Sequence, residues 1–509
     1  YKIVRVKKIN DRKIGKKMNT GMKEHKPPYL MIAILFFGAF VSFLNNSLLN
    51  VALPSIMVDL KIDTYATVQW LATGYMLVSG VLIPVSAFLI TRFKNRTLFL
   101  AAMGLFTVGT AVAAFAPNFG VLLAGRMIQA AGSSVMGPLL MNVMLVSFPR
   151  EKRGAAMGIF GLVMITAPAI GPTLSGYIVE YYDWRLLFEM ILPFAVISLI
   201  LAFWKLENVM DTRPTTLDAI SVVLSIVGFG GLLYGCSIAS SEGWTSTETI
   251  VFLVIGAIGF AWFIIRQFRL EQPLLDLRVY KYPMFALGSI ISMVTSAAMF
   301  SGMILTPAYV QNVRGISPLD SGLMMLPGAI IMGIMSPITG RLFDKFGPRI
   351  LALTGLTITA YSTYLLSELQ IDSTYTYIVF IYTIRMFGMS MIMMPIMTNG
   401  LNQLPTRLNP HGTAVNNTAQ QVVGSIGTAV FVTLMNSLAV DKGTELAAGL
   451  NMANATEADF AQIKALALLE GIQYSFFIAT IITLVALVLS FFLKRVNVSP
   501  EELAKLEKQ

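Results

Sequence analysis

Charged residues are scarce in this chain of 509 residues. Only 13% of its residues are Asp, Glu, Lys or Arg, and 55% are hydrophobic, whereas soluble domains carry about 25% charged residues. The single cysteine, Cys236, excludes an intrachain disulfide. No phosphate-binding loop, metal-ligand cluster or hydrolase triad is recognisable, and neither histidine, His25 nor His411, lies deep in an apolar run. These absences predict an integral membrane protein with no cofactor, no metal and no enzymatic activity.

Apolar runs are abundant instead, and fourteen of them are long enough to cross a bilayer, which takes about 20 residues. They lie at 29–53, 66–90, 97–116, 119–147, 154–179, 186–205, 217–239, 248–267, 283–310, 318–340, 349–367, 375–397, 412–438 and 471–493. Proline or asparagine interrupts two of these runs, 318–340 and 412–438. We therefore expect an all-α membrane protein with fourteen transmembrane helices.

Positive charge is distributed unevenly among the segments that connect these runs. With the N-terminus inside, 30 of the 37 Lys and Arg residues fall in the tails and inner connections. The positive-inside rule then places both termini in the cytoplasm. The net charge of +10 is attributed to this topology and to anionic lipid rather than to a nucleic-acid partner. The longest outer connection, 440–470, is acidic, and we expect it to form a short amphipathic helix.

An internal repeat divides the chain into two halves. LITRFKNR at 89–96 and GRLFDKFGPR at 340–349 follow corresponding runs, and an intramembrane arginine follows each, Arg126 and Arg385. Two parallel six-helix repeats with a helix pair between them account for all fourteen runs. The predicted boundaries are a basic tail at 1–28, a first bundle at 29–205, a linker with two extra helices at 206–282, a second bundle at 283–495 and a tail at 496–509. The chain begins with Tyr, and Met18 and Met22 are candidates for its natural start.

The run GIFGLVMITAPAIGPTLSG, from Gly158 to Gly176, combines small residues with two prolines. Small residues on one side of a helix let a neighbouring helix approach closely, and Pro172 bends the helix and removes a backbone donor. One interpretation is ordinary helix packing. The other is a bendable helix in a protein that alternates between two states.

These patterns resemble the fourteen-helix drug:proton antiporter family of the major facilitator superfamily, from about residue 29 to 495. The run above resembles the family's antiporter motif, with Ala167 in place of a glycine. Further matches are NVALP at 50–54, Trp70-Leu71 with Tyr75, Arg126 with Gln129 and Gly132, Trp184-Arg185, Gly243-Trp244 and PLLDLR at 273–278. On this resemblance, the antiporter motif comprises Gly158, Ala167, Gly171, Pro172 and Gly176.

The resemblance implies the major facilitator fold, with two bundles that rock around a central cavity. It also implies export of hydrophobic or cationic drugs driven by proton entry, hence antibiotic resistance, in the bacterial cytoplasmic membrane. The expected partners are small-molecule drugs, protons and the lipid bilayer, and the expected state is a monomer.

Two departures from the family pattern affect this expectation. The first run reads Leu-Asn-Asn-Ser at 44–47, where the family has Leu-Asp-x-Thr, and an amide cannot titrate. The first copy of the loop motif keeps Arg92 but has Thr91 and Lys94 in place of Asp and Gly. The second copy is complete at Gly340, Asp344, Gly347 and Arg349. We therefore expect the inner gate to depend on the second copy, with Asp344 paired to nearby cations.

Arg126 is the most informative single residue, because a guanidinium inside a membrane requires partners. With an amide at position 45, we expect Asn45, Asn46, Gln129 and main-chain carbonyls to supply them. One interpretation places Arg126 beside the coupling site, and the other makes it a structural tie between the first and fourth helices. For Arg385 the structural interpretation is favoured.

No Asp or Glu lies at the centre of a predicted span, so the proton carrier must be sought near the span ends. The nearest carboxylates are Glu180, Glu189 and Asp218. Glu189 is the first candidate because its neighbours are apolar, and an apolar setting raises a carboxyl pKa. The alternative is an interfacial carboxylate that faces water or pairs with Arg185.

Candidates for the substrate cavity come from both halves: Tyr75, Tyr309, Met324, Arg385, Asn416, Asn417 and Gln420. Flexible thioethers and aromatic rings suit promiscuous binding, but packing and lipid contact are the alternative for each of them. The amides at 416, 417, 420 and 421 form a polar stripe that should face the cavity or another helix rather than lipid.

The leading hypothesis is a proton-coupled multidrug exporter. A dedicated exporter of one endogenous molecule, such as a peptide, siderophore or lipid, is the alternative, and an uptake carrier on the same fold stays open. A non-transporting sensor or a membrane-embedded enzyme is a remote alternative. The missing carboxylate at position 45 favours neutral or zwitterionic substrates, since no central anion would attract a cation.

Overall fold

The computed structural model describes residues 29–62, 65–448 and 456–496, and all the regular secondary structure in them is helical. The predicted tail at 1–28 and nearly all of the tail at 496–509 lie outside the described residues. Fourteen helical segments in the described part are long and apolar enough to cross a membrane, as predicted.

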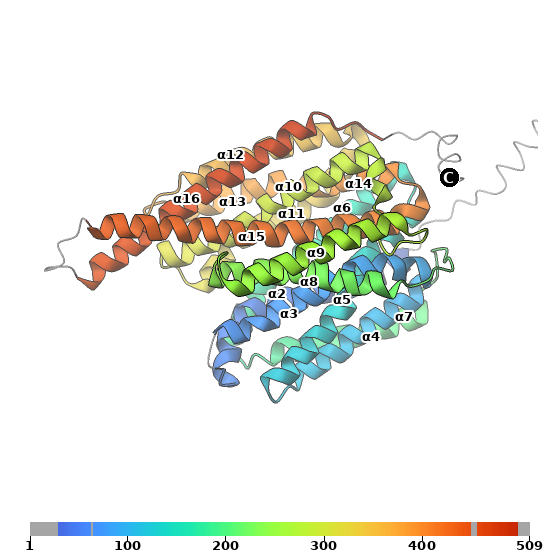
Figure 1. The fold of residues 1–509 in the computed structure, drawn as a ribbon, viewed down its shortest axis with the longest axis horizontal. Helices are drawn as coiled ribbons and strands as arrows, with labels where there is room; N and C mark the ends of the chain where they lie inside the picture. The colour runs from blue at the N-terminus through green and yellow to red at the C-terminus, as the bar shows by residue number, and fades with distance from the viewer. Residues whose placement is uncertain (1–28, 63–64, 449–455, 497–509) are drawn as a thin grey trace, which may run out of the picture.

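The helices group into two halves with a pair between them (Figure 1). The first half contains α2 (Tyr29–Asp59), α3 (Tyr65–Arg92), α4 (Asn95–Ala114), α5 (Phe119–Ser147), α6 (Arg153–Tyr181) and α7 (Leu186–Lys205). The pair is α8 (Ala219–Glu242) and α9 (Thr247–Arg269). The second half contains α10 (Pro283–Ala308), α11 (Pro318–Phe346), α12 (Pro348–Ser367), α13 (Tyr375–Ser390), α14 (Met393–Gln403), α15 (Asn409–Ala448) and α16 (Glu457–Ser490).

The two halves meet mainly along two helix pairs, α6 with α11 and α3 with α15. Helices α8 and α9 pack against each other, and α8 also packs against α3 and α15. In Figure 1 this green pair lies in front of the boundary between the first half, coloured blue to teal, and the yellow-to-red second half. The inserted pair therefore contacts both halves rather than standing apart from them.

Positive side chains gather at one end of the bundle, where α3 ends at Arg92, α7 at Lys205 and α9 at Arg269, and where Arg349 lies in the first turn of α12. We call this the basic end. The positive-inside rule predicts that it faces the cytoplasm, and this orientation stays a prediction.

The interruption of a span occurs at a different place from the one that the sequence suggested. Helices α11 and α15 are continuous, although α11 contains Pro327 and Pro337. The twelfth span is instead divided, because α13 ends at Ser390 and α14 begins at Met393. Pro395 lacks the N–H that would bind the Met391 carbonyl, so the helix cannot run unchanged through this point.

The acidic connection at 440–470 does not form a separate short helix in its described part. Instead α15 and α16 both extend beyond the predicted spans, and they project past the other helices at the left of Figure 1. The Lys442 ammonium lies 3.0 Å from Glu445 and 3.4 Å from Glu470, so it bridges the two helices. Residues 449–455 lie outside the described part.

Candidate functional site

Arg126 in α5 is almost completely buried, with 1% of its surface exposed. Its Nη1 donates to Gln129 Oε1 at 3.0 Å, and its Nε donates to the Leu71 carbonyl of α3 at 3.4 Å. The guanidinium carbon lies 4.3 Å from the centre of the Tyr75 ring, in cation–π contact. Gln129 in turn donates to Thr110 of α4 at 2.8 Å. This arginine network therefore joins α3, α4 and α5.

The partners expected for Arg126 are present only in part. Gln129 and a main-chain carbonyl bind it, whereas Asn45 and Asn46 of α2 make no hydrogen bond with it. Asn46 is exposed, and Asn45 is 2% exposed with no partner for its Nδ2 in the described part of the chain. The interpretation of Arg126 as a tie between the first and fourth helices, one of the two alternatives, is therefore not supported by any hydrogen bond to α2 among the described residues. Leu71 and Tyr75 stand one turn apart on α3 and offer both an acceptor and a ring face, so the tie runs to the second span.

Helix α6 crosses α11 with their backbones in contact, and small residues make this possible. A Cβ at Gly340 would collide with the carbonyl oxygen of Gly154, and a Cβ at Gly158 would lie 2.5 Å from the carbonyl oxygen of Ser336. Ser336 Oγ donates to the Gly158 carbonyl at 2.8 Å. The first glycine of the antiporter motif therefore lies at a contact between the two halves.

The middle of the motif lies against α2. A Cβ at Gly171 would collide with Ser47, and Ser47 Oγ lies 3.4 Å from the carbonyl oxygen of the buried Ala167. Further along, a Cβ at Gly176 would lie 3.3 Å from Leu319 of α11. Pro172 lies within this same helix, which stays continuous. Helix α6 is thus packed closely against one helix of its own half and one of the other half.

Asp344 holds this crossing at the basic end. Its two carboxylate oxygens accept hydrogen bonds from the main-chain N–H groups of Gly154 and Ala155, each at 2.9 Å. These groups lie in the first turn of α6, where the helix dipole favours negative charge. The expected pairing of Asp344 with cations is wrong in the described part, where no cation lies within 4 Å of its carboxylate. Arg495 binds instead the main-chain oxygen of Asp344, at 2.7 Å.

The first copy of the loop motif makes different contacts. Thr91 Oγ1 donates to the Ala87 carbonyl within its own helix, at 2.8 Å. The buried Asn95 donates to the Glu207 carbonyl at 2.7 Å and accepts from the Val209 N–H at 3.0 Å. This copy therefore holds the connection that follows α7.

The two copies also turn differently between their helices. Gly347 has a φ of 81°, which favours glycine, whereas Lys94 at the corresponding position has a φ of −60°. The replacement of glycine by Lys94 thus fits its local backbone. Arg92 and Arg349, the other gating candidates, are exposed at the basic end.

Arg385 in α13 is buried in a tighter setting than Arg126. Its Nε donates to Thr363 Oγ1 of α12 at 3.1 Å, and its Nη2 donates to the Ala298 carbonyl of α10. A Cβ at Gly302 of α10 would collide with the guanidinium. Arg385 therefore fills the space between three helices of the second half.

The described part of the chain contains no buried Asp or Glu, and its buried charged side chains are Arg126, Arg153 and Arg385. Glu180 and Glu189 are exposed and have no hydrogen bond or ion pair among the described residues. Neither candidate carrier is therefore held in an apolar pocket.

Arg185 pairs with acids other than Glu189. Its Nη1 lies 2.8 Å from Asp59 and 3.5 Å from Asp183, and Trp184 Nε1 donates to Asp59 at 3.0 Å. The hydrogen bonds from Trp184 and Arg185 hold the pKa of Asp59 below its usual range. The Trp184-Arg185 pair thus joins the start of α7 to the end of α2.

The structure does not bring all the cavity candidates together. Tyr309 and Met324 are fully buried in an apolar cluster at the end of the second half opposite the basic end. Tyr75 belongs to the Arg126 network, and its hydroxyl shares a hydrogen bond with Ser133. On α15, Asn416 is buried with no partner for its Nδ2 in the described part, whereas Asn417 and Gln420 are half-buried.

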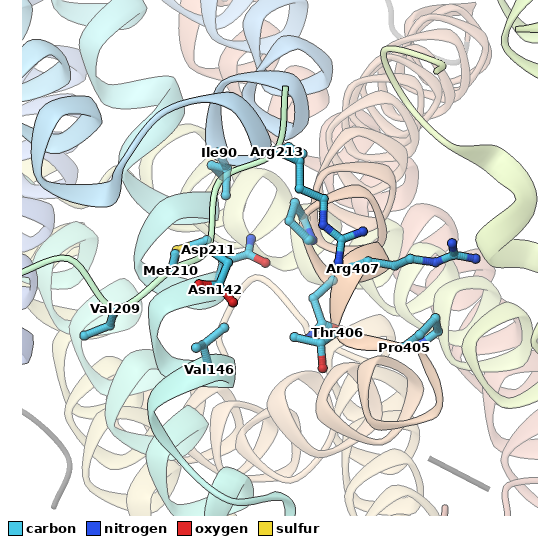
Figure 2. Close-up of a pocket in the computed structure, with 13 residues that line it drawn as sticks. Ile90, Asn142, Val146, Val209, Met210, Asp211, Arg213, Pro405, Thr406 and Arg407 are labelled. Carbon is cyan, nitrogen blue, oxygen red and sulfur yellow. The ribbon is translucent and has the colours of Figure 1, made fainter. Parts of the chain in front are cut away.

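Two adjoining cavities, of about 410 and 680 Å³, lie at the basic end. The smaller one lies between the ends of α3 and α5 and the start of α15 and is lined by Val209 to Asp211 (Figure 2). The larger one is lined by 213–216, by parts of 271–282 and by residues next to α15. Both share Thr91, Arg213 and Arg407, and neither is lined by Arg126.

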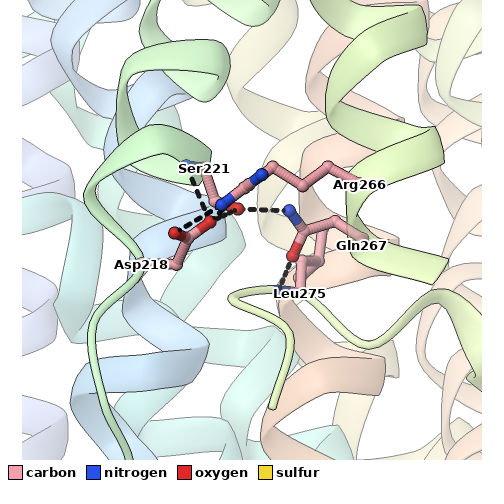
Figure 3. Close-up of polar contacts among 5 residues, drawn as sticks. All are labelled: Asp218, Ser221, Arg266, Gln267 and Leu275. Carbon is pink, nitrogen blue, oxygen red and sulfur yellow. Dashed lines mark hydrogen bonds and ion pairs between the residues drawn. The ribbon is translucent and has the colours of Figure 1, made fainter. Parts of the chain in front are cut away.

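A polar cluster joins α8 and α9 at the same end (Figure 3). Arg266 binds Asp218 with two hydrogen bonds, at 2.7 and 2.9 Å, and Asp218 also accepts from Ser221. The Arg266 bond holds the pKa of Asp218 well below its usual range. Gln267 donates to Ser221 at 2.7 Å and accepts from the Leu275 N–H at 3.2 Å. The cluster therefore fixes the connection that follows α9.

Sequence reasoning missed these contacts at the basic end. The sequence marks Asp218 only as a carboxylate near a span end, and it places Arg213 and Arg407 only among the positive charges of the inner connections. The signal in the sequence is an acid directly before α8 and an arginine near the end of α9. A short connection joins these two helices, so they run antiparallel. Such a pairing places the two side chains at the same level.

The chain matches the family described as "Major Facilitator Superfamily" across residues 35–428. It is 47% identical to "Uncharacterized MFS-type transporter YcnB" of Bacillus subtilis (strain 168), over 94% of this chain and 98% of the relative. It is 44% identical to "Lincomycin resistance protein LmrB" of the same organism, with the same two coverages. It is 30% identical to "Multidrug resistance protein Stp" of Mycobacterium tuberculosis (strain CDC 1551 / Oshkosh), over 77% of this chain and 73% of the relative.

Among solved structures, that of the human organic anion transporter MFSD10 (TETRAN) is similar, with a TM-score of 0.61. It covers 90% of this chain and 99% of its own, at 12% sequence identity. This likeness concerns the fold alone.

Proposed function

We propose that this chain, which belongs to the major facilitator superfamily, exports hydrophobic or amphipathic drugs from the cytoplasm in exchange for protons. On this proposal it acts as a monomer in the bacterial cytoplasmic membrane, with the basic end in the cytoplasm. The observation that carries the proposal is the 44% identity, over almost the whole of both chains, to a protein named for lincomycin resistance.

The contacts of α6 and the buried arginines support an exporter that changes conformation. Small residues let α6 pack closely against α2 and α11, one from each half, which suits helices that move as rigid bodies against each other. Arg126 is a charge within the membrane-spanning part of the first half, and such charges mark functional sites by default. We propose that Arg126 takes part in coupling through Gln129 and Tyr75.

The absence of a buried carboxylate in the described residues bears on the substrate. A buried anion would attract cationic drugs, whereas the buried charged side chains of the described residues are all cations. We therefore propose that neutral or zwitterionic drugs are the preferred class. Glu189, then Glu180, remain the candidates for carrying the proton, although both are exposed.

Inside-out membrane vesicles that contain the protein test this function directly. The lumen is acidified, lincomycin and a panel of neutral and cationic drugs are added one at a time, and luminal pH is followed with a quenched dye. Proton release on addition of a drug is the expected result. No release across the panel, with folded protein present, would contradict drug:proton antiport and favour export of one endogenous molecule.

The same vesicles test the carriers. Glu189→Gln and Glu180→Gln are made separately, and each is assayed for drug export against a gradient. If both variants keep proton-driven export, neither carboxyl carries the proton.

A further inference from the structure

The two cavities at the basic end are lined by cations that form no ion pair within the described part of the chain. Arg213 and Arg407 line both cavities, and Arg278 and Lys281 line the larger one. None of these four side chains has an acid within 4 Å in the described part of the chain. Arg213, Lys281 and Arg407 are exposed at the basic end, so a ligand can reach them from solution.

Acidic side chains at the cavities do not neutralise these cations. Asp211 lines the smaller cavity, and Glu271 and Asp276 line the larger one. The Asp276 carboxylate caps the short helix at 277–281, since it accepts a hydrogen bond from the Arg278 N–H at 3.0 Å. Cations outnumber acids in both cavities, by two to one in the smaller and four to two in the larger.

Hydrogen bonds fix the walls that present these cations. The Arg213 N–H donates to the Thr91 carbonyl at 3.0 Å, which attaches the connection after α7 to the end of α3. Arg278 Nη2 donates to the Leu270 carbonyl at 3.0 Å. The Asp276 N–H donates to His411 Nδ1 at 3.1 Å, which attaches the connection after α9 to α15.

Arg213 lies in the connection between α7 and α8, which is bound to α3 of the first half, whereas Arg407 lies in the second half. Figure 2 shows Arg213 reaching toward the smaller cavity from the connection after α7, and Arg407 lying beside the start of α15. A ligand bound to both guanidinium groups would therefore join the connection after α7, beside α3 of the first half, to the second half.

From this arrangement, we propose that the two cavities form one binding site for a molecule that carries a phosphate group. Guanidinium groups match phosphate oxygens with pairs of parallel hydrogen bonds. Cavities of this size hold molecules larger than a bare ion. The hydroxyl and amide groups of Thr406, Asn142, Thr216 and Gln272 in the lining suit a polyol or sugar attached to the phosphate.

The same chemistry is offered by two sources, an anionic phospholipid head group and a soluble phosphate compound. Basic pockets between transmembrane helices bind anionic head groups. Neither source depends on the drug substrate, so the proposal stands apart from the transport function.

The test measures equilibrium binding to the purified full-length protein in a neutral detergent. The probes are dioctanoyl phosphatidylglycerol, dioctanoyl phosphatidylcholine and glycerol phosphate. The test variant is Arg213→Gln/Arg407→Gln. The matched control is Arg269→Gln/Arg341→Gln, which removes two exposed arginines at the basic end that line neither cavity. Thermal unfolding of all three proteins checks that they are folded.

Saturable binding of phosphatidylglycerol is expected, weakened at least about tenfold in the test variant and less than about twofold in the control. If glycerol phosphate binds as tightly as phosphatidylglycerol, the ligand of this site is a soluble phosphate compound. If phosphatidylglycerol binds and glycerol phosphate does not, the ligand of this site is an anionic phospholipid head group. Equal weakening in both variants would show general surface attraction and overturn the proposal, as would equal binding of phosphatidylcholine or no binding of either phosphate probe.

Discussion

The two halves of this protein carry the same loop motif but use it in different ways. In the second half, Asp344 accepts two main-chain hydrogen bonds from the first turn of α6, and the crossing beside it brings two backbones into contact. In the first half, Thr91 binds within its own helix, and the end of α3 faces a cavity of about 410 Å³ beside the start of α15. At the basic end, the contact between α6 and α11 is therefore closed, and the contact between α3 and α15 is open. We call them the closed contact and the open contact.

The difference shows what a single carboxylate does at such a contact. A threonine hydroxyl satisfies itself on the preceding turn of its own helix, whereas a carboxylate accepts from two N–H groups of another helix. The connection after α7 lies at the open contact instead, attached through Asn95. The sequence repeat therefore does not produce a symmetrical gate.

The buried arginines Arg126 and Arg385, one in each half, also have different surroundings. Arg126 is surrounded by side chains that have polar groups of their own, Gln129 and Tyr75. Arg385 is pressed against the backbone of α10 at Gly302 and Ala298. We infer a functional role for the first and a packing role for the second, and the following substitutions test the contrast.

The largest effect is expected from a methyl group at the closed contact. In Gly340→Ala, the new Cβ meets the rigid carbonyl of Gly154, so α6 and α11 must separate. In the matched variant Gly80→Ala, the Cβ meets only the flexible end of Leu233. We expect drug export to fall below about a tenth of wild type in the first variant and to stay within about twofold in the second. Equal losses at matched protein levels would contradict the contrast.

The next effect separates the two arginines. Arg126→Ala should lose most export, to below about a tenth of wild type, while the amount of folded protein stays unchanged. Arg385→Ala removes a side chain packed among three helices and should lower the melting temperature and the yield of folded protein. Export assays measure the loss of transport, and thermal unfolding measures the loss of stability, in both variants. Loss of folded protein in Arg126→Ala would favour the structural tie to α3 instead.

A smaller effect is expected when the charge of Asp344 is removed. Asp344→Asn keeps one acceptor but loses the anion at the start of α6, a cost of about 1 kcal/mol. We expect the closed contact to open about fivefold more often. The rate at which a maleimide labels Thr166→Cys, in a Cys236→Ser background, measures this opening, because Thr166 packs against Gly333 of α11.

Thr91→Asp serves as the matched variant for that experiment, because it places a carboxylate at the corresponding position of the open contact. It should leave the labelling rate at position 166 unchanged. Faster labelling in Thr91→Asp, or an unchanged rate in Asp344→Asn, would show that the carboxylate does not hold the closed contact.

The smallest effect concerns the inserted pair. Because Arg266 lowers the pKa of Asp218, the ionised pair stabilises the protein above the pKa of Asp in the unfolded chain, about 3.9. This contribution is lost as pH falls through the lower pKa of the folded state. Asp218→Asn should therefore lower the melting temperature by a few degrees at pH 7, and the difference from wild type should shrink below about pH 4. A difference that does not depend on pH would contradict the ion pair as its cause.

The number of spans, the two repeats and the family were all predictable from the amino-acid sequence. Each depends on local properties, namely the length of apolar runs, the presence of arginine within them and the order of short motifs. The antiporter motif was likewise recognisable, since small residues in a regular pattern mark a face for close packing. The bilayer restricts such a chain to helices that satisfy their own backbone, so the helical fold followed from composition.

The choice of partners was decided only by the tertiary structure. The sequence suggested Asn45 for Arg126 and a cation for Asp344, whereas the structure supplies Leu71 with Tyr75, and the start of α6. These pairings depend on which helices cross and at what level, and residues far apart in the chain set that geometry. The same reason applies to Arg213 and Arg407, which are unremarkable charges in the sequence and share a cavity only because two distant connections meet at the basic end.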